Sequence, residues 1–401
     1  MDLRTLHAQR WFAGKGRAVD DLSQTVDIGG LGVVDVRYAD SAEPERYLVH
    51  DDGLRWGALL GALGTGPLTN ATGRLELVRG PALDSLRAPA GAEERLASLD
   101  QSNTLVVVGD RLLVKAYRNL RSGVHPEVET FAALAGSDAP VPRFGGSLVL
   151  TEAGGVRTTL ALLQEYIAGA ASGWEAMISP VAAQLRGERD VALPPLADAG
   201  TAAAVLHRVL AERLGTERVG VAGWHAEAVH TLAEACALER SLDGAAAAEL
   251  GARLQPLAQV SDRLRQRIHG DLNVAQCLFA GREVTIVDFE GNPTIPLERR
   301  RLPDTPLRDV ATLLCSIDHV GSAAARRAEG TDPTAWIEAT SAAVLQAYEQ
   351  EIGTPADPAL LHALQVVAEC RELVYAHRVV PEWAYVARAA LARLLDTPVP
   401  T

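Results

Sequence analysis

The stretch from residue 265 to residue 293 constrains this chain more than any other. It reads RQRIHGDLNVAQCLFAGREVTIVDFEGNP. Asp271 closes a His-Gly-Asp triplet, Gln276 follows five residues later, and an apolar run then leads to Asp288. A turn signal at residues 280–282 predicts a two-strand hairpin between Gln276 and Asp288. An ordinary hairpin with polar turn caps is the alternative, but it leaves Asp288 as an unexplained acid at the end of a buried strand.

The spacing of these polar residues fits one known chemistry, phosphoryl transfer from a nucleotide. In such sites an Asp accepts the proton of the attacking hydroxyl, while an amide oxygen and a second Asp hold magnesium against the triphosphate. Asp271, Gln276 and Asp288 stand in that order and at that spacing. We therefore expect ATP and Mg²⁺ as cofactors.

Composition limits the partners of the chain. Its 401 residues are 48% hydrophobic, enough for two or three domains with sizeable cores. Asp and Glu (51) outnumber Lys and Arg (38), and the net charge of −13 argues against nucleic acid or an anionic membrane as a partner. A small neutral or cationic molecule suits this charge better.

The cysteines and the N-terminal sequence predict a cytoplasmic location. The four cysteines are widely separated, so neither a zinc site nor a disulfide framework is indicated. The first residues contain no apolar signal segment, and no run of 18 uncharged apolar residues occurs.

Residues 1–88 predict a small β-rich cap. Segments that alternate between apolar and polar residues occur at 24–28, 32–38 and 46–50, separated by Gly, Asp and Pro. The segment RWFAGKGR at residues 10–17 has glycines around a lysine but lacks the spacing of a phosphate-binding loop. We interpret it, and the glycine clusters at 29–32 and 61–66, as turns.

Residues 89–166 predict a β-rich lobe that binds the nucleotide. Two β-rich runs, 104–108 and 111–117, are joined by a Gly-Asp hairpin turn. Lys115 lies inside the second run, where a lysine is costly unless an anion such as a phosphate meets it; an exposed edge position is the alternative. The residues before the first strand could offer further donors to phosphates, from Ser102, Asn103 and Thr104.

Two more features of this lobe concern the nucleotide. A helix is predicted over residues 124–136, and Glu129 is preferred to Glu127 as the partner of Lys115 because it lies deeper in the helix. A strand at 157–165 runs into a polar, glycine-containing link of the kind expected between two lobes. Its backbone would be available to an adenine at Gln164, Glu165, Tyr166 and Ile167.

Residues 167–401 predict a mainly helical lobe that carries the hairpin. Helical periodicity occurs at 174–179, 197–214, 221–238, 244–257, 306–319, 333–352 and 358–395, the last divided near Pro381. The expected fold class is therefore α+β, with a β-rich lobe and a helical lobe.

Several segments together resemble the aminoglycoside-phosphotransferase-like kinases, and within them the maltokinase-like group. The similar segments are RWFAGKGR, QSNT, LVKAYR, HGDLNVAQ, VDFEGNP and PLRDVA, and they span nearly the whole chain, including the cap. The resemblance implies a bilobal, protein-kinase-like fold with an N-terminal cap. It also implies roles for single residues: Asp271 as the catalytic base, Gln276 and Asp288 as magnesium ligands, Lys115 and Glu129 on the triphosphate, and His269 and Asp309 as structural support.

The departures from the maltokinase pattern lie on the sugar side. This chain has Asn273 where maltokinases have His, and Asn292 where they have an acid. In this respect it looks more like the actinobacterial glucosamine kinases. Glucosamine is cationic, and an acidic site would attract it. Candidate sugar contacts, beside Asp271, are Glu290, Asn292, Glu372, Tyr375 and Trp383.

The sequence thus predicts an ATP-dependent sugar kinase, a monomer or homodimer, that converts glucosamine to glucosamine 6-phosphate. A maltokinase that makes maltose 1-phosphate is the first alternative, and it needs an acceptor groove long enough for two rings. A catalytically silent kinase-like binding protein is the second.

Overall fold

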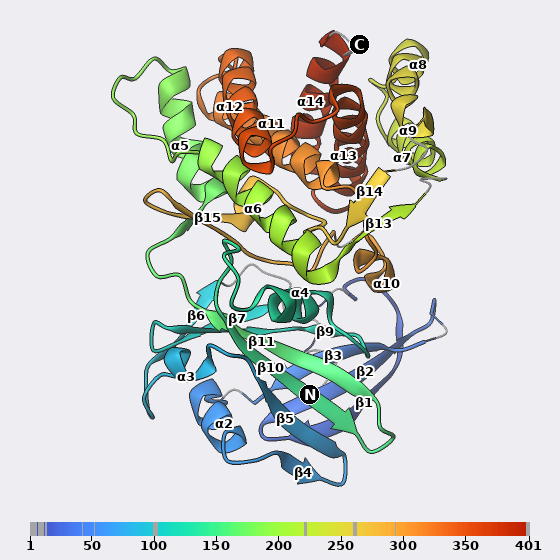
Figure 1. The fold of residues 1–401 in the computed structure, drawn as a ribbon. Coiled ribbons are helices and arrows are strands. Elements are labelled where there is room, and N and C mark those ends of the chain that lie inside the picture. The colour runs from blue at the N-terminus through green and yellow to red at the C-terminus, as the bar shows by residue number, and fades with distance from the viewer. Residues whose placement is uncertain are drawn as a thin grey trace. The chain divides into compact units, whose positions relative to one another are not determined.

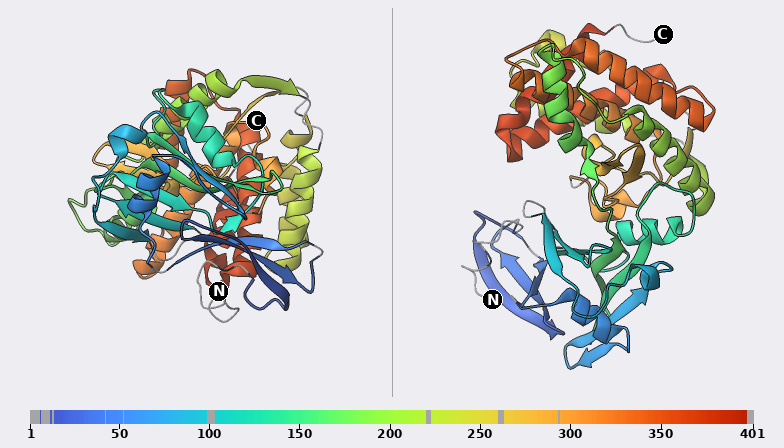
Figure 2. Two further views of the ribbon diagram at one scale, coloured as in Figure 1. Left: turned by 90° about the horizontal axis from the view of Figure 1, so that it is seen from below. Right: turned by 90° about the vertical axis from the view of Figure 1, so that its left-hand side faces the viewer.

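The computed structural model describes residues 6, 12, 14–41, 43–51, 53–98, 103–219, 223–259, 263–292 and 294–397. The chain forms two compact units (Figures 1 and 2). Unit 1 comprises Met1–Gly136 and Pro142–Ala168, and unit 2 comprises Ser137–Val141 and Gly169–Thr401. Unit 1 is rich in strands and unit 2 in helices, so the α+β class is confirmed.

The smaller sheet of unit 1 has the strand order β1-β2-β3-β9, formed by Val19–Ile28, Leu31–Tyr38, Glu45–His50 and Asn119–Leu120. The first three are the strands expected for the cap. Gly29 and Gly30 connect β1 to β2, and both have positive φ (63° and 79°), as a tight hairpin turn with a left-handed backbone requires. The core of this sheet contains Phe12, Val34, Val36, Tyr38, Tyr47 and Val49.

The larger sheet of unit 1 has the order β4-β5-β10-β11-β8-β7-β6. In chain order its strands are Leu68–Asn70, Gly73–Arg79, Glu94–Ser98, Thr104–Val108, Leu112–Ala116, Phe144–Glu152 and Arg157–Glu165. Three helices accompany it, α2 (Trp56–Leu63), α3 (Leu83–Leu86) and α4 (Pro126–Leu134). Because β5 pairs with β10 and β9 pairs with β3, the expected segments 1–88 and 89–166 exchange strands rather than forming separate sheets.

Unit 2 is built mainly from helices (Figure 1). They are α5 (Gly173–Leu185), α6 (Ala197–Leu214), α7 (Trp224–Leu238), α8 (Gly244–Arg253), α9 (Pro256–Gln259), α10 (Leu297–Arg300), α11 (Leu307–Arg327), α12 (Thr334–Ile352), α13 (Pro358–Val379) and α14 (Ala384–Asp396), with the 3₁₀ turns η1 (Val274–Gln276) and η2 (Pro381–Trp383). The expected division near Pro381 is confirmed. Helix α5 runs on past Pro180, where the expected helix stops at Ser179.

Two small sheets complete unit 2. The expected hairpin is present as β15 (Cys277–Ala280) and β16 (Glu283–Ile286), and β12 (Ala171–Ser172) pairs with β15. A second pair, β13 (Thr216–Val219) with β14 (Arg263–Gln266), was not predicted. These two strands are four residues long and rich in Arg and Glu, so they lack the alternation of apolar and polar residues that marks a strand.

Helix α11 lies at the centre of the helical unit and packs against α5, α12, α13 and α14. Side chains around most of its circumference are buried, among them Asp309, Ser316 and Asp318. A helix buried around most of its circumference is a rigid support, and the buried polar side chains on it need partners inside the protein.

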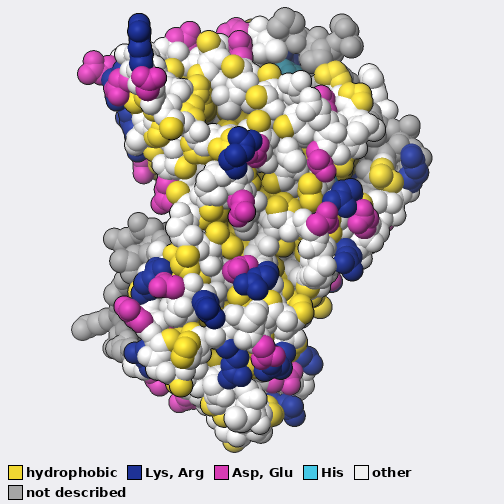
Figure 3. All heavy atoms as spheres, turned by 60° about the vertical axis from the view of Figure 1, so that its left-hand side comes forward, with side chains coloured by type: hydrophobic (Ala, Val, Ile, Leu, Met, Phe, Trp, Pro, Cys, Tyr) yellow, Lys and Arg dark blue, Asp and Glu magenta, His cyan; other side chains and the backbone are white. Residues whose placement is uncertain are grey.

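The described helices include none that is both long and apolar enough to span a bilayer. On the face drawn in Figure 3, side chains of both signs are interspersed with apolar ones.

Candidate active site

The loop that carries Asp271 is held by hydrogen bonds to Asp309 on α11. The backbone N–H groups of His269 and Gly270 donate to the two carboxylate oxygens of Asp309, at 2.7 and 2.8 Å. His207 Nε2 donates to the same carboxylate at 3.0 Å, and the Tyr348 hydroxyl bonds to His207 Nδ1 at 3.0 Å. Burial raises the pKa of Asp309, but these donors outweigh burial and hold the pKa below its usual value. Asp309 is therefore a buried anion whose carboxylate is hydrogen-bonded by protein donors and whose role is structural.

His269 connects this loop to the strand that leads to Asp288. Its Nε2 donates to the carbonyl of Val287 at 2.9 Å, and its Nδ1 accepts the backbone N–H of Asp271 at 3.3 Å. One nitrogen donates and the other accepts, so the ring is neutral, and burial lowers the pKa of His269 accordingly. A neutral His269 ties the two acidic residues of the site to one another.

Gln276 and Asp288 flank the hairpin at its open end. Gln276 Nε2 donates to Asp288 Oδ2 at 3.3 Å, and Val287 N–H donates to the Gln276 carbonyl at 3.0 Å. Asp288 has φ of 70°, in a region that residues other than glycine rarely adopt and that is typical of functional sites. The amide oxygen of Gln276 and the carboxylate of Asp288 are the kind of hard oxygen donors that Mg²⁺ prefers.

Asp271 itself is in a different electrostatic state from Asp309. No hydrogen bond or ion pair of its carboxylate occurs within the described part of the chain. Burial, and after it the negative charges of Glu372, Asp288 and Asp309, raise the pKa of Asp271 well above its usual value. A carboxylate with a raised pKa and no donor is suited to accept a proton.

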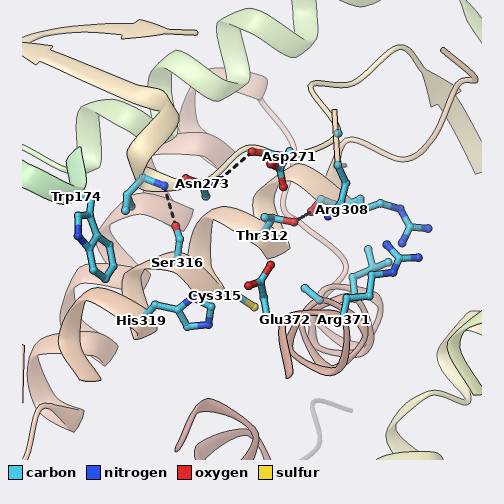
Figure 4. A pocket seen from close by; sticks show the side chains of 15 residues that line it. Trp174, Asp271, Asn273, Arg308, Thr312, Cys315, Ser316, His319, Arg371 and Glu372 are labelled. Atoms are coloured by element: carbon cyan, nitrogen blue, oxygen red, sulfur yellow. Dashed lines mark hydrogen bonds between the residues drawn. The ribbon is translucent and has the colours of Figure 1, made fainter. Parts of the chain in front are cut away.

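A pocket opens beside Asp271 within unit 2 (Figure 4). Its walls come from α5, the Asp271 loop, α11 and α13. Fifteen residues line it: Trp174, Gly270, Asp271, Asn273, Val274, Asn292, Arg308, Thr312, Cys315, Ser316, His319, Leu364, Ala368, Arg371 and Glu372. The carboxylate of Glu372 points into the pocket from the side opposite Asp271.

The positive charges around the pocket are already matched by acids. Arg308 pairs with Asp304 at 2.7 Å and Arg371 with Glu227 at 2.9 Å.

His319 is paired as well, through Glu369. The two groups lie 2.9 Å apart, and Glu369 is fully buried. Burial lowers the pKa of His319, but the charge and hydrogen bond of Glu369 outweigh it and raise the pKa to about 9. Glu372, like Asp271, has no hydrogen bond or ion pair among the described residues. The pocket thus offers two unmatched carboxylates to a ligand, which favours a cation with hydroxyl groups.

Asn273 has a local structural role beside the pocket. Its side-chain oxygen accepts the N–H of Ala275 at 2.9 Å and so caps η1, while its amide donates to the carbonyl of Asp271 at 3.2 Å. Ser316 on α11 accepts the N–H of Val274 at 2.9 Å. These bonds fix the backbone that follows Asp271.

In unit 1, Lys115 pairs with a glutamate of α4, Glu127, which lies two residues before the predicted Glu129. The Lys115 Nζ lies 2.9 Å from Glu127 Oε2, which also accepts the Tyr117 hydroxyl at 2.8 Å. Glu127 is fully buried, whereas Glu129 is half-buried. Both glutamates lie in the first turn of α4. The ion pair identifies Glu127 as a residue that positions Lys115, and a role for Glu129 stays a prediction.

The end of β11 carries an unsatisfied polar group on the same face as Lys115. Leu162 pairs with Lys115 and Gln164 with Leu113, and residues two apart on a strand share a face. Gln164 is buried, and its Oε1 has no hydrogen-bond partner within the described residues. An acceptor of this kind fits the amino group of an adenine.

The backbone beyond Gln164 is less open than expected. The N–H groups of Glu165 and Tyr166 donate to the carbonyls of Arg143 and Arg111 at 3.0 and 2.9 Å. The N–H of Ile167 has no partner in the part of the chain that is described. Of the four predicted residues, Ile167 is therefore the one whose backbone N–H is available to an adenine.

Of the predicted phosphate donors before β7, Ser102 lies outside the described residues. The side chains of Asn103 and Thr104 bind Arg118: Asn103 Oδ1 accepts its backbone N–H at 3.3 Å, and Thr104 Oγ1 accepts its Nε at 2.7 Å. Arg118 also donates to the Leu48 carbonyl at 3.0 Å, and burial lowers its pKa to about 10. Arg118 thereby joins Thr104 of the larger sheet to Leu48 of the smaller one, and a role of Asn103 and Thr104 on phosphate stays a prediction.

With this geometry in view, comparison with known proteins identifies the family. No family model matches the chain. It is 35% identical over 325 residues to a glucosamine kinase of Streptacidiphilus jiangxiensis, covering 75% of this chain and 73% of the relative. It is 33% identical over 362 residues to a glucosamine kinase of Mycolicibacterium smegmatis, covering 84% and 87%. The chain belongs to the glucosamine kinase family.

Solved structures agree with this assignment. A glucosamine kinase in complex with glucosamine, ADP and inorganic phosphate covers 98% of this chain and 99% of its own, with 28% identity and a TM-score of 0.70. A second crystal form reaches a TM-score of 0.74 at 28% identity. The predicted fold and the predicted resemblance to actinobacterial glucosamine kinases are confirmed.

The predicted sugar contacts of this glucosamine kinase family member divide into three groups. Asp271, Glu372 and Asn292 line the pocket. Glu290 does not line it. Tyr375 and Trp383 line a neighbouring cavity instead.

Four residues that line the pocket from α5 and α11 were not predicted: Trp174, Thr312, Ser316 and His319. Helical spacing could have indicated three of them, because Thr312, Ser316 and His319 follow Asp309 at intervals of three and four residues and so continue one face of α11. Nothing in the sequence directs Trp174 to that place.

Proposed function

We propose that this chain transfers the γ-phosphate of ATP to a hydroxyl of glucosamine, the C6 hydroxyl, to give glucosamine 6-phosphate and ADP. The observation that carries the proposal is the pair of unmatched carboxylates, Asp271 and Glu372, in one pocket of a glucosamine kinase family member. An ammonium group needs one such carboxylate, and a reacting hydroxyl needs the other.

Glu372 is the residue we assign to the ammonium group of the sugar. It lies on α13 and faces the pocket, where the nearby cations Arg371 and His319 are paired with Glu227 and Glu369. A charge-assisted hydrogen bond from the ammonium to Glu372 contributes about 1.5–3 kcal/mol. The same contact would discriminate against glucose and N-acetylglucosamine, which lack the charge.

Asp271 is assigned to the reacting hydroxyl. Its carboxylate orients the hydroxyl and accepts its proton as the oxygen attacks the γ-phosphorus. The raised pKa brings the carboxylate closer to the pH at which the enzyme works, which makes proton acceptance easier. Asp309 and His269 keep the loop in place during this transfer.

The nucleotide and its metal ion are assigned to the residues that the sequence predicted for them and that the structure supports. Lys115, positioned by Glu127, offers an ammonium to the phosphates, and Gln164 and Ile167 offer an acceptor and a donor to the adenine. Gln276 and Asp288 supply the oxygen donors for magnesium. When bound, this ion neutralises negative charge on the triphosphate.

A direct assay tests the proposed function. Purified full-length chain, ATP and MgCl₂ are mixed separately with glucosamine, glucose, N-acetylglucosamine, maltose and an aminoglycoside, and ADP release is followed. We expect the highest kcat/KM with glucosamine and a phosphorus NMR signal coupled to the C6 protons of the product. Preferred turnover of maltose would support the maltokinase alternative. ATP binding without transfer to any sugar would support the silent binding protein.

A further inference from the structure

We propose that the acceptor pocket continues into a second, aromatic subsite that receives a ring attached to glucosamine. The substrate class would then include glycosides of glucosamine, such as a disaccharide with glucosamine at its non-reducing end. This inference rests on the proposed function, because it places the glucosamine ring itself beside Asp271.

The first observation is that two cavities of unit 2 share a wall. The pocket that contains Asp271 and a neighbouring cavity are both lined by Trp174, His319 and Glu372. The neighbouring cavity is lined further by Tyr375, Ala376, Val380, Trp383, Val386 and Ala387, and not by Asp271. The two cavities are thus adjacent, separated only by shared side chains such as Glu372 and Trp174.

The second observation is the chemistry of the neighbouring cavity. Three of its side chains are large aromatic rings, Trp174, Trp383 and Tyr375, and the others are aliphatic apart from His319 and Glu372. Aromatic side chains with one polar atom suit a ligand that has both an apolar face and hydroxyl groups, as a sugar ring has. The Tyr375 hydroxyl has no hydrogen-bond partner among the described residues and could donate to such a ring.

The third observation is that the aromatic rings are held in place while remaining accessible. The rings of Trp174 and Trp383 meet edge to face at 5.5 Å, and Trp383 stacks on Tyr385 at 6.2 Å. The guanidinium of Arg326 lies over Tyr385 at 4.6 Å. Trp383 nevertheless keeps 37% of its surface exposed, which is high for a tryptophan with two aromatic neighbours.

Helix α13 and the following turn η2 carry residues of both subsites. Tyr375 follows Glu372 by three residues on α13, about one turn, so both side chains lie on one face of the helix. Trp383 stands at the end of η2, directly after α13 ends at Val379. A ligand that binds Glu372 through its ammonium group therefore has Tyr375 and Trp383 next along the wall.

The matched ligands for a test differ only in the group on the anomeric oxygen. Kinetics are compared for free glucosamine, methyl β-glucosaminide, phenyl β-glucosaminide and the β-1,4-linked disaccharide of glucosamine. We expect the phenyl glycoside and the disaccharide to have lower KM values than the methyl glycoside, because only they carry a ring for the second subsite.

The matched variants are Trp383→Ala, Trp383→Phe and the control Val379→Ala, which removes an exposed apolar side chain of the same connection outside both cavities. Trp383→Ala should lower the ratio of kcat/KM for the phenyl glycoside to that for the methyl glycoside by about tenfold. Trp383→Phe should keep most of this ratio, and Val379→Ala all of it. Thermal unfolding of each variant shows whether it is folded.

The outcomes separate the two proposals. If free glucosamine is phosphorylated but no ring-bearing glycoside is, or if Trp383→Ala leaves the ratio unchanged, the second subsite is wrong and the proposed function stands. If free glucosamine is not phosphorylated at all, the proposed function fails, and the subsite fails with it.

Discussion

Asp271 lies on a loop of unit 2 that Asp309 supports, but the surroundings of the two carboxylates shift their pKa values in opposite directions. Asp309 is buried under three donors, from His207, His269 and Gly270, and its pKa is lowered. Asp271 has no donor among the described residues, faces Glu372 across a pocket, and has a raised pKa. A carboxylate that supports structure is fully bonded, whereas one that must accept a proton is left without bonds in the resting protein. Substitution of Asp271 and Asp309 tests this contrast, and substitution of their neighbours sharpens it.

The largest expected effect is on turnover. Asp271→Asn removes the proton acceptor and should lower kcat by about 10²–10⁴-fold, the usual range for a general base. Nucleotide binding should be largely retained, because Asn keeps the shape of the side chain. Steady-state kinetics and titration with ADP measure the two properties. Turnover near the wild-type rate would remove Asp271 from its assigned role.

The two residues should also differ in stability, with opposite signs. Asp309→Asn leaves buried donors facing an amide and should lower the free energy of unfolding by about 3 kcal/mol. Asp271→Asn removes a charge whose folded pKa is raised and should increase stability at neutral pH. Denaturant unfolding at pH 7 measures both. Equal losses in both variants would show that Asp271 is also structural.

The pH dependence of the Asp309 contribution has a definite sign. Because the folded pKa of Asp309 is lowered, its carboxylate stabilises the protein above the unfolded pKa, and this stabilisation is lost as pH falls through the folded pKa. The stability difference between wild type and Asp309→Asn should therefore shrink in acid. A difference that grows as the pH falls would indicate that Asp309 is protonated in the folded protein.

A smaller effect is expected at Glu372. Glu372→Gln should raise the KM for glucosamine about 10–100-fold, which corresponds to the loss of one charge-assisted hydrogen bond. The KM for glucose should change little, because glucose has no ammonium group. An equal rise in KM for both sugars would show that Glu372 maintains the shape of the pocket rather than recognising the charge of the ammonium group.

The smallest effect concerns the choice between two glutamates of α4. Glu127→Gln should raise the KM for ATP several-fold, because Lys115 loses the carboxylate 2.9 Å away. Glu129→Gln is the matched control and should change it less. The reverse order of effects would assign the positioning of Lys115 to Glu129.

How far the sequence could be interpreted depends on how far apart the residues of a site lie along the chain. Asp271, Gln276 and Asp288 lie within one short hairpin, so their spacing along the chain was enough to indicate phosphoryl transfer. The acceptor pocket combines Trp174, His319 and Glu372 from three helices far apart in the sequence, and only packing brings them together. Glu127 and Glu129 are two residues apart, and periodicity alone did not indicate the ion pair between Glu127 and Lys115.

The measurement that tests the account most directly is the pH dependence of kcat/KM for glucosamine in the wild type and in Glu372→Gln. The negative charge of Glu372 contributes, after burial, to the raised pKa of Asp271. We expect an acidic limb above the usual range for an aspartate in the wild type, and a limb displaced to lower pH in Glu372→Gln. Identical acidic limbs in the two proteins would contradict the proposed coupling between the base and the carboxylate that binds the amine.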